Sequence, residues 1–313
     1  SPSALEASLA QAAIADLARQ LPQCGSNDDF AATCGTLRRR MKQVKEGETA
    51  AVAEAVVHAM RMYFGHDRCT DRCKPLAGVL DEYCASKECL RPLSMELLRG
   101  VLREQLRNLH DSAWTKHMEG GPELLRAINL SCVMLLNNVS RAVAATLLLE
   151  LGTDESETIA SSLVVKCLRK VTKGLASSSH AEAEANALLD AAWVWLRRAQ
   201  PRLCLGAGQG KARGVVETAV AALLDGVREV VDVAQQACCG AALAWAEQLR
   251  PEERRLLQPC QPPLGAGSAG VDKENVPCGN APTKRDSTGG DAKADRTSTA
   301  PAILAASPQN AGR

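Results

Sequence analysis

The stretch GPELLRAINLSCVMLLNNV, residues 121–139, decides the fold class. Its large apolar side chains recur every three or four residues, which places them on one face of an α-helix. Pro122 stands at the start, where a helix loses nothing by the missing N–H group. The pattern predicts a helix over 121–138 whose inner face carries Leu124, Leu125, Ile128, Cys132, Leu135, Leu136 and Val139.

The same spacing recurs along most of the chain, and no sustained alternation of apolar and polar residues indicates a strand. Pro201 is expected to end one of these helices, because proline removes a hydrogen bond within a helix. The fold class is therefore predicted to be all-α. Apolar stripes predict helices over 92–110, 155–175, 181–200 and 211–235, weaker helices over 3–21 and 28–44, and another stripe from Val52 to Phe64.

Helix pairs recur at roughly 40 residues, a spacing typical of HEAT-like repeats. Such pairs bury their apolar faces against their neighbours, so we predict an α-solenoid of antiparallel helix pairs over residues 1–257. Over residues 258–313 Pro, Gly, Ser, Thr and Ala dominate. Because this segment has too few large apolar side chains to offset its ordering entropy, we expect a disordered C-terminal tail.

The composition excludes several classes of protein. The chain of 313 residues has 37 Lys and Arg against 36 Asp and Glu. That balance argues against a nucleic-acid-binding protein, which normally has a basic surface. Long apolar runs are absent, so no transmembrane helix and no membrane partner is expected.

Thirteen cysteines are scattered along the chain, and His66, Cys69, Cys73, Cys84 and Cys89 form a loose group. A structural zinc site usually takes two ligands from a tight Cys-x2-Cys turn, and this group contains none. Cys69 and Cys73, four residues apart, would share one helix face, which suits a core stripe equally well. We expect reduced thiols that pack as small apolar side chains, and no bound metal.

The glycine-rich stretch GAGQGKARG, residues 206–214, is not a phosphate-binding loop. Leu205 and Ala212 stand where a P-loop requires glycine and a hydroxyl side chain, and no strand precedes the stretch. We expect a flexible interhelical loop and no nucleotide cofactor. The five histidines lie far apart, without a nucleophile elbow or paired carboxylates, so no catalytic residues and no enzymatic activity are predicted.

Two features are candidates for partner binding. Lys166, Arg169, Lys170 and Lys173, here called the basic strip, fall on one face of the helix over 155–175, largely away from its apolar stripe. A strip of this kind is either a solvated face or a surface that meets an acidic partner. Trp114, with Lys116 beside it, lies in a break between helices, where a tryptophan is either tucked into a groove or an interface anchor.

Lys273, Glu274 and Asn275 in the tail match the KEN degron that the anaphase-promoting complex recognises. A degron must be bound as an extended, accessible peptide, and the composition of the tail meets that condition. A match of three residues also occurs often by chance, so both interpretations stay open.

Three segments resemble the C-terminal part of the TOG-domain microtubule polymerases, the family of the plant MOR-type and vertebrate ch-TOG proteins. The segments are MEGGPELLRAINLSCVMLLNNVSRAVAATLLLEL (118–151), SLVVKCLRKVTKGL (162–175) and GVVETAVAALLDGVREV (214–230). Their order and spacing agree with the family, and the resemblance covers 92–232 well and 40–91 weakly. The short link at Gly152–Ser156 and the glycine-rich stretch depart from the family pattern.

The resemblance implies a TOG-like helical domain that supports microtubule assembly through tubulin or an adaptor protein. It also implies a location in the cytoplasm and cytoskeleton, at spindle poles or microtubule organising centres. Tubulin-contacting residues of the family are not carried over to this chain. The alternative is a HEAT-like interaction scaffold unrelated to microtubules.

Overall fold

The computed structural model describes residues 12–66, 70–111, 118–153, 161–206 and 215–258. Within these ranges the chain forms α-helices and short 3-10 and π turns and no strand, which confirms the all-α prediction. The helices are α2 (Ile14–Gln20), α3 (Asn27–Arg40), α4 (Glu46–Met60), α5 (Thr70–Ala85), α6 (Lys87–Leu90), α7 (Met95–His110), α8 (Gly121–Asn138), α9 (Arg141–Thr153), α10 (Ser161–Thr172), α11 (Ala181–Gly206), α12 (Val215–Ala237), α13 (Cys239–Gln248) and α14 (Pro251–Leu257).

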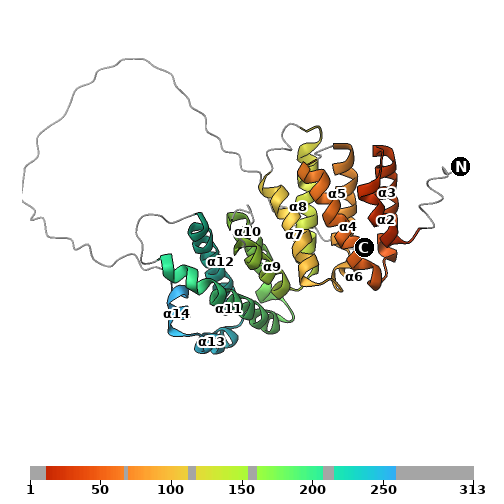
Figure 1. Ribbon diagram of the computed structural model, residues 1–313. Coiled ribbons are helices and arrows are strands. Elements are labelled where there is room, and N and C mark those ends of the chain that lie inside the picture. Colours follow the sequence, from red (N-terminus) through yellow and green to blue (C-terminus); the bar gives the residue numbers. More distant parts are fainter. Residues whose placement is uncertain (1–11, 67–69, 112–117, 154–160, 207–214, 259–313) are drawn as a thin grey trace, which may run out of the picture.

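The helices stack in two rows, as in an α-solenoid (Figure 1). In one row α2 packs on α4, α4 on α7, α7 on α9, α9 on α11 and α11 on α13. In the other row α3 packs on α5, α5 on α8 and α10 on α12. Long helices that follow each other along the chain thus alternate between rows, and the predicted solenoid is confirmed.

Local signals set where these helices begin and end. Ser94 accepts a hydrogen bond from the backbone N–H of Leu97 at the start of α7, at 3.3 Å. Ser140 does the same for Val143 at the start of α9, also at 3.3 Å. Helix α10 ends at Thr172, three residues before the predicted boundary at 175, and Gly174 just beyond it has a φ of 77°, a left-handed conformation that favours glycine.

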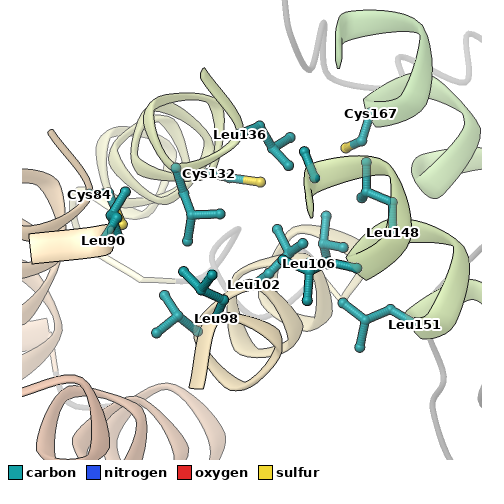
Figure 2. Packing of buried hydrophobic residues seen from close by; sticks show 14 of the residues in the cluster. Cys84, Leu90, Leu98, Leu102, Leu106, Cys132, Leu136, Leu148, Leu151 and Cys167 are labelled. Carbon is teal, nitrogen blue, oxygen red and sulfur yellow. The ribbon is translucent and has the colours of Figure 1, made fainter. Parts of the chain in front are cut away.

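One continuous cluster of buried apolar side chains runs from Ile14 on α2 to Leu249 after α13. Figure 2 shows its middle part, where Leu102 and Leu106 of α7 meet Cys132 of α8 and Leu148 of α9. Since each helix contributes its apolar face to the same cluster, burial of this surface stabilises the stack as one body.

The predicted end of a helix at Pro201 was wrong, because α11 continues through Pro201 to Gly206. The φ of proline, near −65°, is compatible with helix, and its cost is limited to one lost hydrogen bond and local crowding. Helix α5 likewise contains Pro75.

Among the described residues no helix has the length and apolar character needed to cross a membrane.

Candidate functional site

Helix α10 has one buried apolar face and one charged outer face, as its sequence predicts. Its side chains Leu163, Val164, Cys167, Leu168 and Val171 are buried in the core. Lys166 and Lys173 are exposed and Lys170 is half-buried on the other side of the helix, Lys173 lying one residue beyond its end. The basic strip therefore lies on the outer surface of the row that contains α10 and α12.

Arg169, the fourth member of the basic strip, is already paired. Its Nε donates to Glu229 Oε2 and its NH2 donates to Glu229 Oε1, so α10 and α12 are joined by a two-point ion pair. The hydrogen bond from Arg169 lowers the pKa of Glu229, and the bond to Glu229 raises the pKa of Arg169. Because its charge is compensated, Arg169 contributes little to an acidic partner's attraction.

The three lysines of the basic strip are not compensated in this way. Within the described part of the chain, the side-chain ammonium groups of Lys166, Lys170 and Lys173 have neither a hydrogen bond nor an ion pair. Two of them also line a hollow in the surface.

That hollow, here called the α10–α11 hollow, has a volume of about 490 Å³. It lies where α8 ends, α9 begins, α10 ends and α11 begins. The charged residues that line it are Arg141, Lys170, Lys173 and Glu184. The remaining lining residues are Leu136, Asn137, Val139, Ser140, Ala142, Val171, Ala183 and Ala187.

Arg141 holds the walls of the α10–α11 hollow together. Its Nε donates to Glu184 Oε2 at 2.7 Å, and its NH1 donates to the backbone carbonyls of Val171 and Lys173, the latter at 3.0 Å. The last carbonyls of a helix have no partner within the helix, so Arg141 satisfies groups that α10 leaves open. One side chain thus links the start of α9, the end of α10 and the start of α11.

A second hollow of about 490 Å³ lies on the other side of the α10 end, against α12. Its lining includes Arg169, Lys173 and Glu229. The charges of Arg169 and Glu229 cancel each other here. Among the residues that line this second hollow, Lys173 therefore carries the one uncompensated charge. The α10–α11 hollow is therefore the more positively charged of the two.

The other candidates from the sequence fall outside the described residues. Trp114 and Lys116 do so, as do Lys273, Glu274 and Asn275 of the KEN match and most of the glycine-rich stretch. Their predicted roles stay predictions.

Of the cysteines with described side chains, Cys239 is exposed, and the others pack in the core or lie near its edge. Cys73 Sγ lies 3.2 Å from the Tyr63 carbonyl, and Cys84 Sγ accepts from Gln105 Nε2 at 3.5 Å, while Cys89 is also buried. Burial raises the pKa of Cys84. No group of three His, Cys, Asp or Glu side chains within the described ranges could hold a metal ion, and Cys69 lies outside them.

Sequence reasoning missed Arg141, Glu184 and Glu229, the residues that decide the charge around the basic strip. Glu184 and Glu229 lie 43 and 60 residues from their arginine partners. Periodicity reports the face of a residue's own helix and carries no signal for such distant pairs.

Comparison with known proteins adds no family assignment. The resemblance of residues 92–232 to the TOG-domain microtubule polymerases therefore stays a prediction. Neither the protein-family models nor the curated proteins include a match to this chain.

Proposed function

We propose that this chain is a non-catalytic adhesion domain that binds an acidic protein surface through Lys166, Lys170 and Lys173. The partner is tubulin, the microtubule, or an adaptor protein at spindle poles or organising centres. The observation that carries the proposal is the row of lysines on α10 that no described carboxylate compensates.

The solenoid suits this role because it holds the lysines at fixed positions. The apolar side of α10 is buried, so the helix cannot rotate its charges away from a partner. Arg169 and Glu229 tie α10 to α12, and Arg141 ties its end to α9 and α11. A rigid set of charges orients a partner and raises its association rate more than its final affinity.

The choice of tubulin or a tubulin-bound adaptor as the partner rests on the sequence resemblance. Two of its three segments, 162–175 and 214–230, form α10 and most of the helix beside it. These are the helices that carry the basic strip and the Arg169–Glu229 pair.

The proposal is tested by sedimenting the full chain with stabilised microtubules, and by gel filtration with unpolymerised tubulin. We expect binding that Lys166→Glu with Lys170→Glu abolishes and that added salt weakens, because exposed charges are screened beyond about 10 Å at 0.1 M ionic strength. Lys42→Glu with Lys87→Glu reverses the same number of charges at two exposed lysines in the other half of the chain and is expected to bind normally.

Two results would count against the proposal: binding that does not depend on the lysines, and failure to bind microtubules, tubulin and every adaptor tested. Binding that survives Lys166→Glu with Lys170→Glu would make the basic strip a solvated face. Absence of binding to both microtubules and tubulin would favour the adaptor-binding form, which pull-down of spindle-pole proteins with the same variants then tests. Failure of that assay too would leave a HEAT-like scaffold unrelated to microtubules.

A further inference from the structure

We propose that the α10–α11 hollow binds a short acidic segment of the partner, in which a glutamate stands next to a large apolar residue. The glutamate would pair with Lys170 and Lys173, and the apolar side chain would pack on the hollow's floor. This inference rests on the proposed function and narrows it, since it assigns two of the three lysines to a shaped site.

The charge of the hollow favours an anionic occupant. Three cationic side chains and one carboxylate line it, which leaves a net charge of two positive. The carboxylate of Glu184 is engaged by Arg141 at 2.7 Å and does not neutralise the lysines. Lys170 and Lys173 therefore line the hollow without a described side-chain partner, and burial of an anion between them would strengthen each attraction by excluding water.

The floor of the hollow favours a peptide over a free anion. Leu136, Val139 and Val171 line it together with Ala142, Ala183 and Ala187. An apolar side chain that packs against these residues leaves water, which favours its binding. A volume of about 490 Å³ is also within the range of small-ligand pockets and exceeds what a lone carboxylate needs.

The hydrogen bonds that Arg141 already forms favour a carboxylate over a phosphate as the bound anion. Guanidinium groups recognise phosphate by two parallel hydrogen bonds, and here Arg141 is already committed to Glu184 and to two backbone carbonyls. The ammonium groups of the lysines remain available to bind an anion. Each acts as a point charge, so a single carboxylate can pair with them. The formal net charge of +1 also gives the chain no extended basic field for a nucleic acid.

The walls are fixed before a partner arrives, because Arg141 links the ends of three helices around the hollow. A preformed site loses less conformational entropy on binding than one that must close. A segment of a few residues therefore loses little binding free energy to ordering of the site.

The test uses the full chain and a fluorescent nine-residue peptide made of three Glu-Leu-Glu repeats, followed by fluorescence anisotropy at low salt. One control peptide replaces every Glu by Gln, and another replaces every Leu by Ser. The protein variants are Lys170→Gln with Lys173→Gln, and Lys166→Gln, which removes a lysine of the same strip that does not line the hollow. Thermal unfolding of each variant checks that the fold is retained.

We expect the double variant to weaken binding of the Glu-Leu-Glu peptide about tenfold, since it removes both ammonium groups that would pair with the glutamate. Lys166→Gln is expected to change binding by less than about twofold, and both control peptides are expected to bind weakly. Equal losses for Lys166→Gln and the double variant would overturn the inference and leave a diffuse basic surface, consistent with the proposed function. Failure to bind the peptide while microtubules still bind would overturn it as well.

The converse result separates the two ideas. Peptide binding that depends on Lys170 and Lys173, without any binding to microtubules, tubulin or a spindle-pole adaptor, would support the hollow as a peptide site and refute the microtubule proposal.

Discussion

Arg169 on α10 and Glu229 on α12 meet through two hydrogen bonds, Nε to Oε2 and NH2 to Oε1, across 60 residues of sequence. Their side chains stay 60% and 41% exposed, so the pair lies on the surface beside the three free lysines. Glu229 thus sets how much positive charge the basic strip offers to a partner.

Replacing Glu229 by glutamine should strengthen binding to the acidic partner, since it removes a negative charge and releases Arg169 into the basic strip. We expect affinity for microtubules or tubulin to rise about threefold to tenfold at low salt, and less at high salt. Sedimentation at several salt concentrations measures this change.

Asp232→Asn is the matched control, because Asp232 is an exposed carboxylate on the same helix and forms no described ion pair with Arg169. It removes one charge without releasing an arginine, and its effect should be smaller. An equal effect of both substitutions would show that net charge alone matters and that the pairing of Arg169 does not.

Arg141 should matter more for stability than an ordinary surface arginine. Arg141→Gln removes an ion pair to Glu184 and two hydrogen bonds to the end of α10, and these groups are partly buried. We expect a loss of about 1.5–3 kcal/mol in the free energy of unfolding, the range for hydrogen bonds to charged groups. Urea unfolding followed by circular dichroism measures this value.

Arg198→Gln provides the comparison, because Arg198 also pairs with a glutamate of a neighbouring helix, Glu150, at 3.1 Å. Its side chain is 68% exposed, so its pair is screened by water and a loss below about 1 kcal/mol is expected. Losses of the same size for both variants would argue that Arg141 does not hold the helix ends together.

The fold could be predicted from the sequence where each helix has one apolar face. Helices α7, α8 and α12 match the predicted ranges closely for this reason. Helix α9 was not predicted by periodicity, since Leu147, Leu148 and Leu149 are all buried and mark no single face. It lies between α7 and α11 in its row and also packs on α10 and α12.

The candidate site could be predicted only in part, for a related reason. The basic strip is a pattern within one helix, and periodicity finds such patterns. The pairing of Arg169, the three contacts of Arg141 and the α10–α11 hollow depend on how separate helices meet. No local rule links Arg141 to Glu184, so the sequence predicts four equivalent cations where the structure has three uncompensated ones.

Thiol reactivity should follow burial among the nine cysteines whose side chains are described. Cys239 is exposed and should react first with iodoacetamide. Burial raises the pKa of Cys34 from 9.0 to about 12, which lowers its thiolate fraction at pH 8 about a thousandfold. Cys34 should therefore be modified only when the protein unfolds.

Peptide mass spectrometry after timed alkylation at pH 8 measures this order. Addition of denaturant is the control and should make Cys34 and Cys239 equally reactive. Rapid modification of Cys34 in the native protein would show that the helices around it, α2 and α5 among them, open far more often than a packed core allows.

Stability should fall as pH rises from about 4 to about 6, because of Asp81 on α5. Burial raises the pKa of this carboxyl from 3.8 to about 6, although Arg38 lowers it in part, and its Oδ1 has no described hydrogen-bond partner. Between these two pH values the folded chain keeps the proton and the unfolded chain loses it, so folding becomes less favourable as pH rises. Above the folded pKa the penalty is complete and constant.

Asp81→Asn should remove this penalty, since the amide is neutral at every pH. We expect the variant to be more stable than the natural chain by about 1–2 kcal/mol at pH 7, less than the shift alone implies because water reaches part of the side chain and the attraction of Arg38 is lost. At pH 4 the two proteins should be nearly equal. Asp190→Asn, a change at an exposed carboxylate on α11, should leave the pH profile unchanged. Urea unfolding at pH 4, 5, 6 and 7 measures all three chains, and a constant difference between Asp81→Asn and the natural protein across this range would show that ionisation of Asp81 does not limit stability.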